Sequence, residues 1–79
     1  MAKHEDILQF LFDDINSACY NPNHPDYEAH HEVGAEVYFA DFRRFKFWSL
    51  SSGYKPGLIL ARKNERGGYS SSNCFWVKP

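Results

Sequence analysis

The sequence predicts an α+β fold, in which two helices pack against a small antiparallel sheet of about three strands. Three observations favour this class. Apolar residues recur at helical spacing near the N-terminus, two short apolar runs lie in the last third of the chain, and Gly, Ser and Asn residues separate those runs. With 79 residues, of which 18% are aromatic, the chain is expected to form one domain with a core rich in aromatic rings.

The first helix is predicted over residues 4–19. Its apolar residues recur every three or four positions and form one stripe, made of Ile7, Leu8, Leu11, Ile15 and Ala18. Phe10 is expected to widen this stripe. Pro22 and Pro25 end the helix, because the residue before a proline is driven out of the helical region. Residues 20–33 are therefore predicted to form an ordered loop.

Residues 34–40 are predicted to form a strand, because they include three strong β-formers in a row: Val37, Tyr38 and Phe39. A second, short helix is predicted over residues 41–50. Asp41 is suited to cap its N-terminus, and the helix has an apolar face made of Phe42, Phe45 and Trp48.

Residues 57–77 are predicted to form a hairpin. Its two strands are the apolar runs at residues 58–61 and 74–77, each of strand length. The pair Gly67-Gly68 and the polar run at residues 70–73 lie between them and favour turns.

Charge is distributed unevenly along the chain, although the net charge is only −1. Residues 1–40 carry one basic and eight acidic residues, a net charge of −7, and residues 41–79 carry eight basic and two acidic residues, a net charge of +6. The candidate acidic face consists of Asp13, Asp14, Asp26, Glu28, Glu32 and Glu36. The candidate basic face consists of Arg43, Arg44, Lys46, Arg62, Lys63 and Arg66. Either face can serve a partner of opposite charge, or the two halves can neutralise each other across the fold.

The two cysteines, Cys19 and Cys74, are expected to be free thiols of a cytosolic protein, because no signal peptide or long apolar run is present; a disulfide between them is the alternative. A zinc site would draw on these thiols and on His24, His30 and His31. The spacing lacks a Cys-x-x-Cys or His-x3–5-His pair, so no metal or other cofactor is expected. The histidines are expected to be packed in the loop (His24) or exposed (His30 and His31).

Three stretches carry a resemblance to a known family. Residues 19–27 read Cys-Tyr-Asn-Pro-Asn-His-Pro-Asp-Tyr, residues 53–58 read Gly-Tyr-Lys-Pro-Gly-Leu, and residues 69–77 read Tyr-Ser-Ser-Ser-Asn-Cys-Phe-Trp-Val. In this order and at similar spacing, these stretches resemble the phage-type HNH homing endonucleases and their relatives with an ethylene-response-factor-like DNA-binding domain. The resemblance covers about residues 15–77 and implies an HNH-like hairpin at residues 57–77.

The chain differs from that family at the residues that would perform catalysis or bind nucleic acid. The family has Asp-Arg-Ile-Asp where this chain has Ala61-Arg62-Lys63-Asn64, so both acidic positions are replaced and metal-dependent hydrolysis is not expected. The chain stops at Pro79, where nuclease relatives continue into a further helix. The family has a basic, glycine-rich run that contains an arginine, and here residues 29–37, with Glu32 and Glu36, take its place. This replacement weakens the attraction for phosphate.

Together, these patterns suggest a non-catalytic phage accessory protein built on a retired HNH-like scaffold. It is expected to bind and inhibit a host protein or complex that handles nucleic acid, in the cytosol of the bacterial host, as anti-CRISPR proteins do. The acidic face would then present phosphate-like charge to this partner. The alternative is a small DNA-binding module or regulator that uses the basic face. No membrane association is expected.

Overall fold

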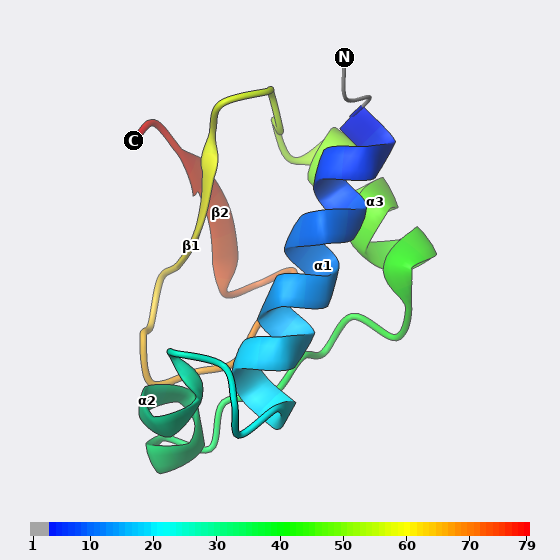
Figure 1. The fold of residues 1–79 in the computed structure, drawn as a ribbon. Coiled ribbons are helices and arrows are strands. Elements are labelled where there is room, and N and C mark those ends of the chain that lie inside the picture. Colours follow the sequence, from blue (N-terminus) through cyan, green and yellow to red (C-terminus); the bar gives the residue numbers. More distant parts are fainter. Residues whose placement is uncertain (1–3) are drawn as a thin grey trace.

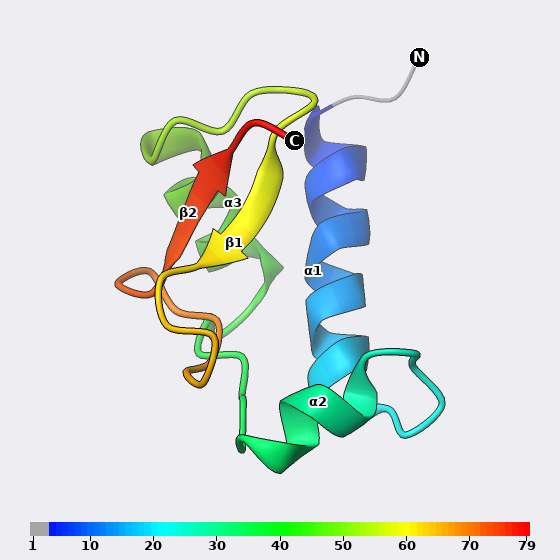
Figure 2. The same ribbon diagram turned by 90° about the vertical axis from the view of Figure 1, so that its left-hand side faces the viewer.

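The computed structural model describes residues 4–79, with side chains from Asp6 onward. Within this range it contains three helices and two strands: α1 (His4–Tyr20), α2 (Tyr27–Glu32), α3 (Phe42–Ser51), β1 (Ile59–Arg62) and β2 (Cys74–Val77). Figures 1 and 2 together show the sheet and α3 packed against each other beside α1, and Figure 1 shows α2 beside the C-terminal end of α1. In Figure 2 the sheet lies in front of α3. The fold is α+β, as predicted, with a smaller sheet than predicted.

Helix α1 matches the first predicted helix to within one residue. Leu8, Ile15 and Ala18 of its apolar stripe are buried. The expectation that Phe10 widens this stripe is wrong, since 70% of Phe10 is exposed. Two residues correspond to about 200° around a helix axis, so Phe10 lies on the side opposite Leu8.

The predicted loop over residues 20–33 contains a short helix, so this prediction is wrong for its second half. Helix α2 has only six residues, and Asp26, which precedes it, makes no capping bond with its side chain. The helix is instead anchored by buried His30. So short a helix carries no apolar periodicity of its own, which is why the sequence pattern does not reveal it.

The predicted strand over residues 34–40 is reduced to a single bridge between Val37 and Tyr69. The Tyr38 N–H donates to the Tyr69 carbonyl at 2.8 Å, and the Tyr69 N–H donates to the Glu36 carbonyl at 2.8 Å. Pairing stops there because the chain turns after Tyr69, where the Asn73 N–H donates back to the Ser70 carbonyl. The described sheet therefore has two strands rather than three.

Helix α3 matches the second predicted helix, and its predicted cap is confirmed. The Asp41 side chain accepts a hydrogen bond from the Arg44 N–H at 2.9 Å. This bond satisfies one of the free N–H groups of the first turn. Phe45 is fully buried on the inner face of the helix.

Strands β1 and β2 pair antiparallel, with Leu60 opposite Trp76 and Ala61 opposite Phe75. The two predicted strands of the hairpin are therefore confirmed. Leu60 and Trp76 pack against the core, whereas Phe75 lies on the outer face and is partly exposed.

The connecting loop is held by Asn73. Its side chain accepts a hydrogen bond from the Asn64 N–H and donates to the carbonyls of Asn64 and Gly68, at distances of 2.9, 3.1 and 2.8 Å.

An aromatic cluster fills the space between α1, α3 and the sheet. The ring of Phe45 lies 5.4 Å from Phe12 and 5.1 Å from Phe39, measured between ring centroids. Trp76 from β2 stacks on Trp48 of α3 at 5.9 Å. The high aromatic content of the sequence is thus used mainly in this cluster. None of the described helices is both long enough and apolar enough to cross a membrane.

Candidate functional site

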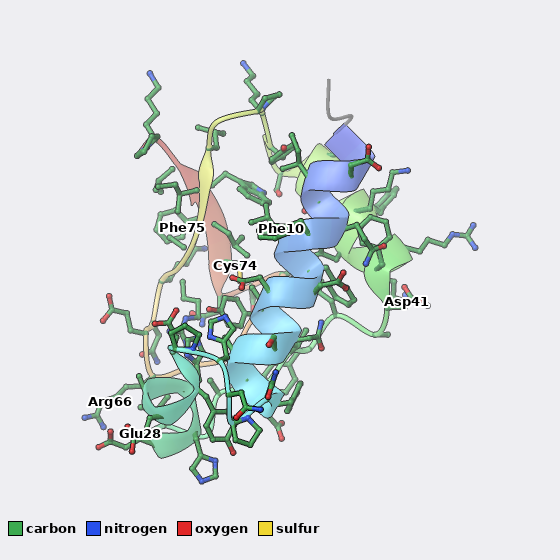
Figure 3. All side chains as sticks on the ribbon, viewed as in Figure 1. Phe10, Glu28, Asp41, Arg66, Cys74 and Phe75 are labelled. Atoms are coloured by element: carbon green, nitrogen blue, oxygen red, sulfur yellow. The ribbon has the colours of Figure 1, made fainter. Side chains whose placement is uncertain are left out.

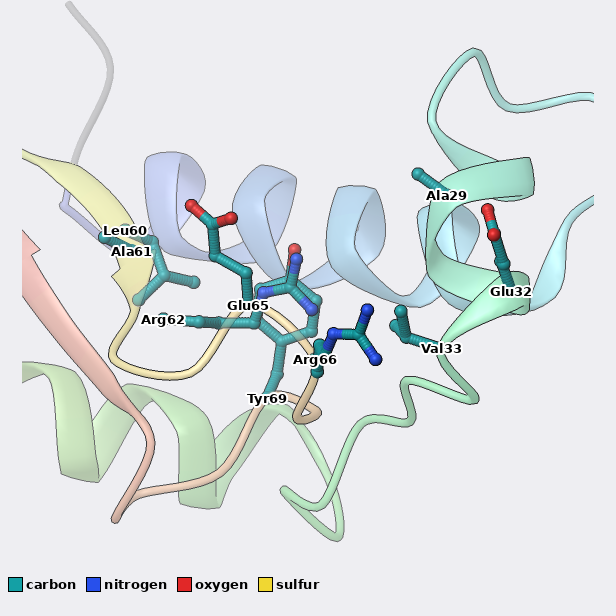
Figure 4. Close-up of a pocket in the computed structure, with 9 residues that line it drawn as sticks. All are labelled: Ala29, Glu32, Val33, Leu60, Ala61, Arg62, Glu65, Arg66 and Tyr69. Atoms are coloured by element: carbon teal, nitrogen blue, oxygen red, sulfur yellow. The ribbon is translucent and has the colours of Figure 1, made fainter.

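A cleft of about 570 Å³ separates α2 from the end of β1 and the loop that follows it. Figure 4 shows the residues that line it. Glu32 lies on the α2 side, and Arg62, Glu65, Arg66 and Tyr69 lie on the hairpin side. Two guanidinium groups and two carboxylates face this space, so its charges are balanced.

Arg62 is held in place at this cleft. It lies on the inner face of β1, and its Nη1 donates a hydrogen bond to the Gly67 carbonyl at 2.8 Å. Its guanidinium carbon lies 4.9 Å from the centroid of the Tyr69 ring, which is a cation–π contact. Arg62 is therefore half-buried and engaged within the fold, rather than free to contact a nucleic acid backbone.

Tyr69 connects the hairpin loop to α2 through His30. The Nδ1 atom of His30 lies 2.8 Å from the Asp26 carbonyl, and its Nε2 atom lies 2.9 Å from the Tyr69 hydroxyl. A carbonyl only accepts, so Nδ1 carries the proton, and Nε2 of the neutral ring accepts from the hydroxyl. The prediction that His30 is exposed is wrong, since this side chain is buried. His31, in contrast, is exposed as predicted.

A hydroxyl that donates to a histidine is the pairing found in many nucleophilic enzymes. Here, burial raises the pKa of Tyr69, although the nearby Arg62 charge acts in the opposite direction. A raised pKa leaves less tyrosinate at neutral pH and makes the hydroxyl a poorer nucleophile. We therefore interpret the His30–Tyr69 bond as a structural link between α2 and the hairpin.

All six residues of the predicted acidic face are exposed. We call this set the acidic surface: Asp13, Asp14, Asp26, Glu28, Glu32 and Glu36. His24 joins two of its members, because its Nε2 lies 2.9 Å from Asp14 and its Nδ1 accepts from the Asp26 N–H at 3.0 Å. The expected packing of His24 within the loop is thus confirmed.

The remaining acidic residues lie on α2 and just after it. Glu28 and Glu32 are one helical turn apart on α2, and Figure 3 shows Glu28 at the α2 end of the molecule. Glu36 lies beside Tyr38 and raises the pKa of the Tyr38 hydroxyl. The negative charge of Glu36 is the larger cause, and its hydrogen bond to the hydroxyl is the second. The acidic surface therefore extends over the C-terminal half of α1, α2 and the segment that follows α2.

Exposed aromatic residues flank the acidic surface. Tyr20 at the end of α1 and Tyr38 are 54% and 61% exposed, and Phe10 lies on the outer side of α1. Tyr20 is fixed in place, because its hydroxyl accepts a hydrogen bond from the Val37 N–H at 2.9 Å. Along the chain, exposed rings thus precede, interrupt and follow the acidic residues.

The predicted basic face is divided between two places. Arg43, Arg44 and Lys46 lie on α3, and Arg62, Lys63 and Arg66 lie at the end of β1 and in the loop. Figure 3 shows Asp41, the cap of α3, on one side of α1 and Arg66 on the other side. Arg62 and Arg66 line the cleft beside α2, whereas Arg43 and Arg44 line a different hollow beside α3, so the two groups do not share one cleft.

Cys19 and Cys74 are both free and buried. Burial is the main cause that raises the pKa of each thiol, so neither is a reactive thiolate at neutral pH. Among the described residues, no three His, Cys, Asp or Glu side chains converge on a point that could hold a metal ion.

Sequence reasoning missed two features of these surfaces, of which only the exposure of two rings has a signal in the sequence. His30 reaches Tyr69, which is 39 residues away along the chain, so only the tertiary fold reveals the pair. The exposure of Phe10 and of Phe47 on α3 is readable from helical periodicity, because each ring lies opposite the buried side of its helix. Comparison of the chain with protein-family models, with curated proteins and with solved structures found no match.

Proposed function

We propose that this chain is a non-catalytic binding protein that occupies the basic surface of a host protein or complex that handles nucleic acid. It acts as an inhibitor of the anti-defence type, and the acidic surface is the face that makes contact. The proposal keeps the function that the sequence patterns suggest and assigns it to one end of the molecule.

The observation that carries the proposal is the difference in exposure and placement between the acidic residues and the basic residues. The acidic residues are all exposed and lie on neighbouring segments, with Tyr20 and Tyr38 exposed among them. The basic residues are divided, and Arg62 is engaged by Gly67 and Tyr69. A divided basic set makes a poor track for a duplex backbone, whereas an exposed acidic set on neighbouring segments suits a basic protein surface.

Carboxylates on such a surface stand where phosphates would lie on a bound nucleic acid. Arginine and lysine side chains that normally bind phosphate also bind carboxylates through charge-assisted hydrogen bonds. Exposed tyrosines add apolar contact area and hydrogen-bonding hydroxyls, and tyrosine is enriched at the energetically important points of protein interfaces. The combination supports affinity for a protein that has both basic and aromatic-binding pockets.

The test uses purified nucleic-acid-handling complexes, including an RNA-guided nuclease with its guide and a restriction complex. Their DNA cleavage is measured against increasing amounts of the chain. The key variant is Asp13→Asn, Asp14→Asn, Glu28→Gln and Glu32→Gln, which removes four charges and leaves an oxygen in place to accept the His24 bond. The matched control is Lys63→Ala with Arg66→Ala, which changes exposed charges of the opposite sign.

We expect the unmodified chain and the basic-residue control to inhibit at least one complex at near-stoichiometric ratio. The charge-neutral variant should require at least tenfold more protein, because several charge-assisted contacts are lost. Equal inhibition by the charge-neutral variant would contradict the assignment of the acidic surface. No inhibition of any complex would contradict the proposed function itself.

A further inference from the structure

A second hollow, which we call the α3 groove, lies beside α3 and shares Tyr38 with the exposed rings that flank the acidic surface. Its volume is about 790 Å³, and it runs between the segment that precedes α3 and the helix itself. Its aromatic lining consists of Tyr38, Phe39, Phe47 and Trp48, and its polar lining consists of Asp41, Arg43, Arg44 and Ser71.

Two aromatic rings at this groove are left out of the aromatic core. Phe47 is 75% exposed and Tyr38 is 61% exposed. Their chain neighbours Phe39 and Trp48 turn inward and pack on each other at 5.2 Å. Phe39 and Trp48 thus belong to the core and also line the groove, whereas Tyr38 and Phe47 are its exposed rings. Exposed rings grouped on a small protein are typical of an interaction site.

Tyr38 is fixed relative to the backbone. Its N–H donates to the Tyr69 carbonyl, and its ring lies against Gly68, where a Cβ atom would approach Tyr38 Cε2 to 2.7 Å. Gly68 therefore permits a close contact that positions this ring. A ring held in advance loses less conformational freedom when a ligand stacks on it.

Two positive charges also line the groove. Arg43 and Arg44 are both exposed, and within residues 6–79 neither has an acidic side chain within 4 Å of its guanidinium. Arg43 is four residues before Phe47, so the two share one side of α3. Asp41, the acidic residue of the groove, uses one carboxylate oxygen to cap the Arg44 N–H.

We propose that the α3 groove binds a short stretch of single-stranded nucleic acid, with bases stacked on Phe47 and Tyr38 and phosphates held by Arg43 and Arg44. Sites for single strands combine aromatic rings, which stack on bases, with cations that follow the backbone. In a duplex the bases stack on one another, so no base face is free to stack on Phe47 or Tyr38. An acidic peptide would engage the two arginines and leave the rings without stacking partners. The inference rests on this groove alone and is independent of the proposed function.

The experiment measures fluorescence anisotropy with a labelled dT12 strand at low salt. The competitors are the dT12·dA12 duplex and a polyglutamate peptide of equal charge. Phe47→Ala and Tyr38→Ala remove one ring each, and Phe10→Ala is the matched control, because Phe10 is equally exposed but lies on α1. Arg43→Ala with Arg44→Ala removes two charges at the groove, and Lys63→Ala with Arg66→Ala removes two outside it. Thermal melting shows that each variant remains folded.

We expect each groove-ring variant to weaken dT12 binding roughly tenfold, within the range that loss of one stacking ring produces. The double arginine variant should also bind weakly and show a shallower dependence on salt, because fewer counterions are released. Phe10→Ala and the Lys63/Arg66 control should bind as the unmodified chain does.

Several results would overturn the inference. Absence of dT12 binding at low salt would do so, as would ring variants that bind like the unmodified chain. Equal competition by the duplex or by polyglutamate would mean that the groove attracts any polyanion. Equal loss in the Lys63/Arg66 control would mean that net charge, rather than this groove, binds the strand.

Discussion

The two ends of this molecule are held together by different kinds of interaction. Where α3 meets the sheet, rings pack in direct contact, with Phe45 fully buried at the centre. Where α2 meets the hairpin loop, the hydrogen bond between His30 and Tyr69 links the two, and the loop itself is held by the hydrogen bonds of Asn73. The first end draws its stability from apolar burial, and the second draws it from polar contacts of modest net free energy. Segments of the second kind are typical places for binding residues.

The largest expected effect concerns the aromatic end. Phe45→Ala should lower the free energy of unfolding by about 3–5 kcal/mol, because it leaves a cavity among Phe12, Phe39 and Trp48. Urea denaturation measures this change. Phe47→Ala, on the exposed side of the same helix, is the control and should alter stability by no more than about 0.5 kcal/mol. Similar values for the two variants would remove the distinction between core and groove rings.

Gly68→Ala should have the next largest effect. The added Cβ atom would overlap with the Glu36 carbonyl oxygen and press on the Tyr38 ring. We expect a loss of about 1–3 kcal/mol in the free energy of unfolding, as for overpacking elsewhere. Ser71→Ala, in the same loop but exposed, serves as the control. An unchanged melting temperature for Gly68→Ala would show that the bridge between Val37 and Tyr69 does not form.

Tyr69→Phe tests the polar end directly. It removes the hydroxyl that donates to His30 and leaves the buried Nε2 without a partner, so we expect a loss of about 1–2 kcal/mol in the free energy of unfolding. Tyr27→Phe is the matched control, since its hydroxyl contacts the exposed His31 at 3.3 Å. If Tyr27→Phe is as costly as Tyr69→Phe, the buried bond has no special role in joining α2 to the hairpin.

The smallest effect should appear only in alkali. Burial raises the pKa of Cys19, Cys74 and Tyr69 in the folded chain. As the pH rises, the unfolded chain therefore loses these protons before the folded chain does. The contribution of these groups to the stability of the folded state is complete below about pH 9. It declines as the pH rises above about 9 for the two thiols and above about 10 for the tyrosine. Unfolding free energies measured between pH 7 and pH 11 should fall. A flatter fall in Tyr69→Phe would identify the contribution of that hydroxyl, and constant stability would contradict the raised pKa values.

The helices with strong signals could be predicted from the sequence. The stripe of α1 and the Asp41 cap of α3 are local patterns, and so are the two apolar runs of the hairpin. Helix α2 and the loss of the third strand depend on contacts between distant residues, His30 with Tyr69 and Val37 with Tyr69. No local propensity encodes such contacts.

The candidate site likewise has features that the sequence predicts and features that only the folded chain reveals. Exposure of the acidic residues follows from their charge and is visible in the sequence. The separation of the basic residues is revealed only by the folded chain, because Arg62 and Arg66 line the cleft beside α2 whereas Arg43 and Arg44 line a different hollow beside α3. Arg62 illustrates the difference, because its position in the sequence indicates a solvent-facing charge, whereas Gly67 and Tyr69 engage it.

The most direct test of the proposed function is a competition measurement. For a complex that the chain inhibits, the apparent dissociation constant of the chain is measured at increasing concentrations of the nucleic acid that the complex binds. If the acidic surface occupies the place of phosphates, the apparent constant should rise in proportion to the nucleic acid concentration, and the charge-neutral acidic variant should bind weakly throughout. A dissociation constant that does not change with nucleic acid would show that the chain binds elsewhere and would contradict the proposal.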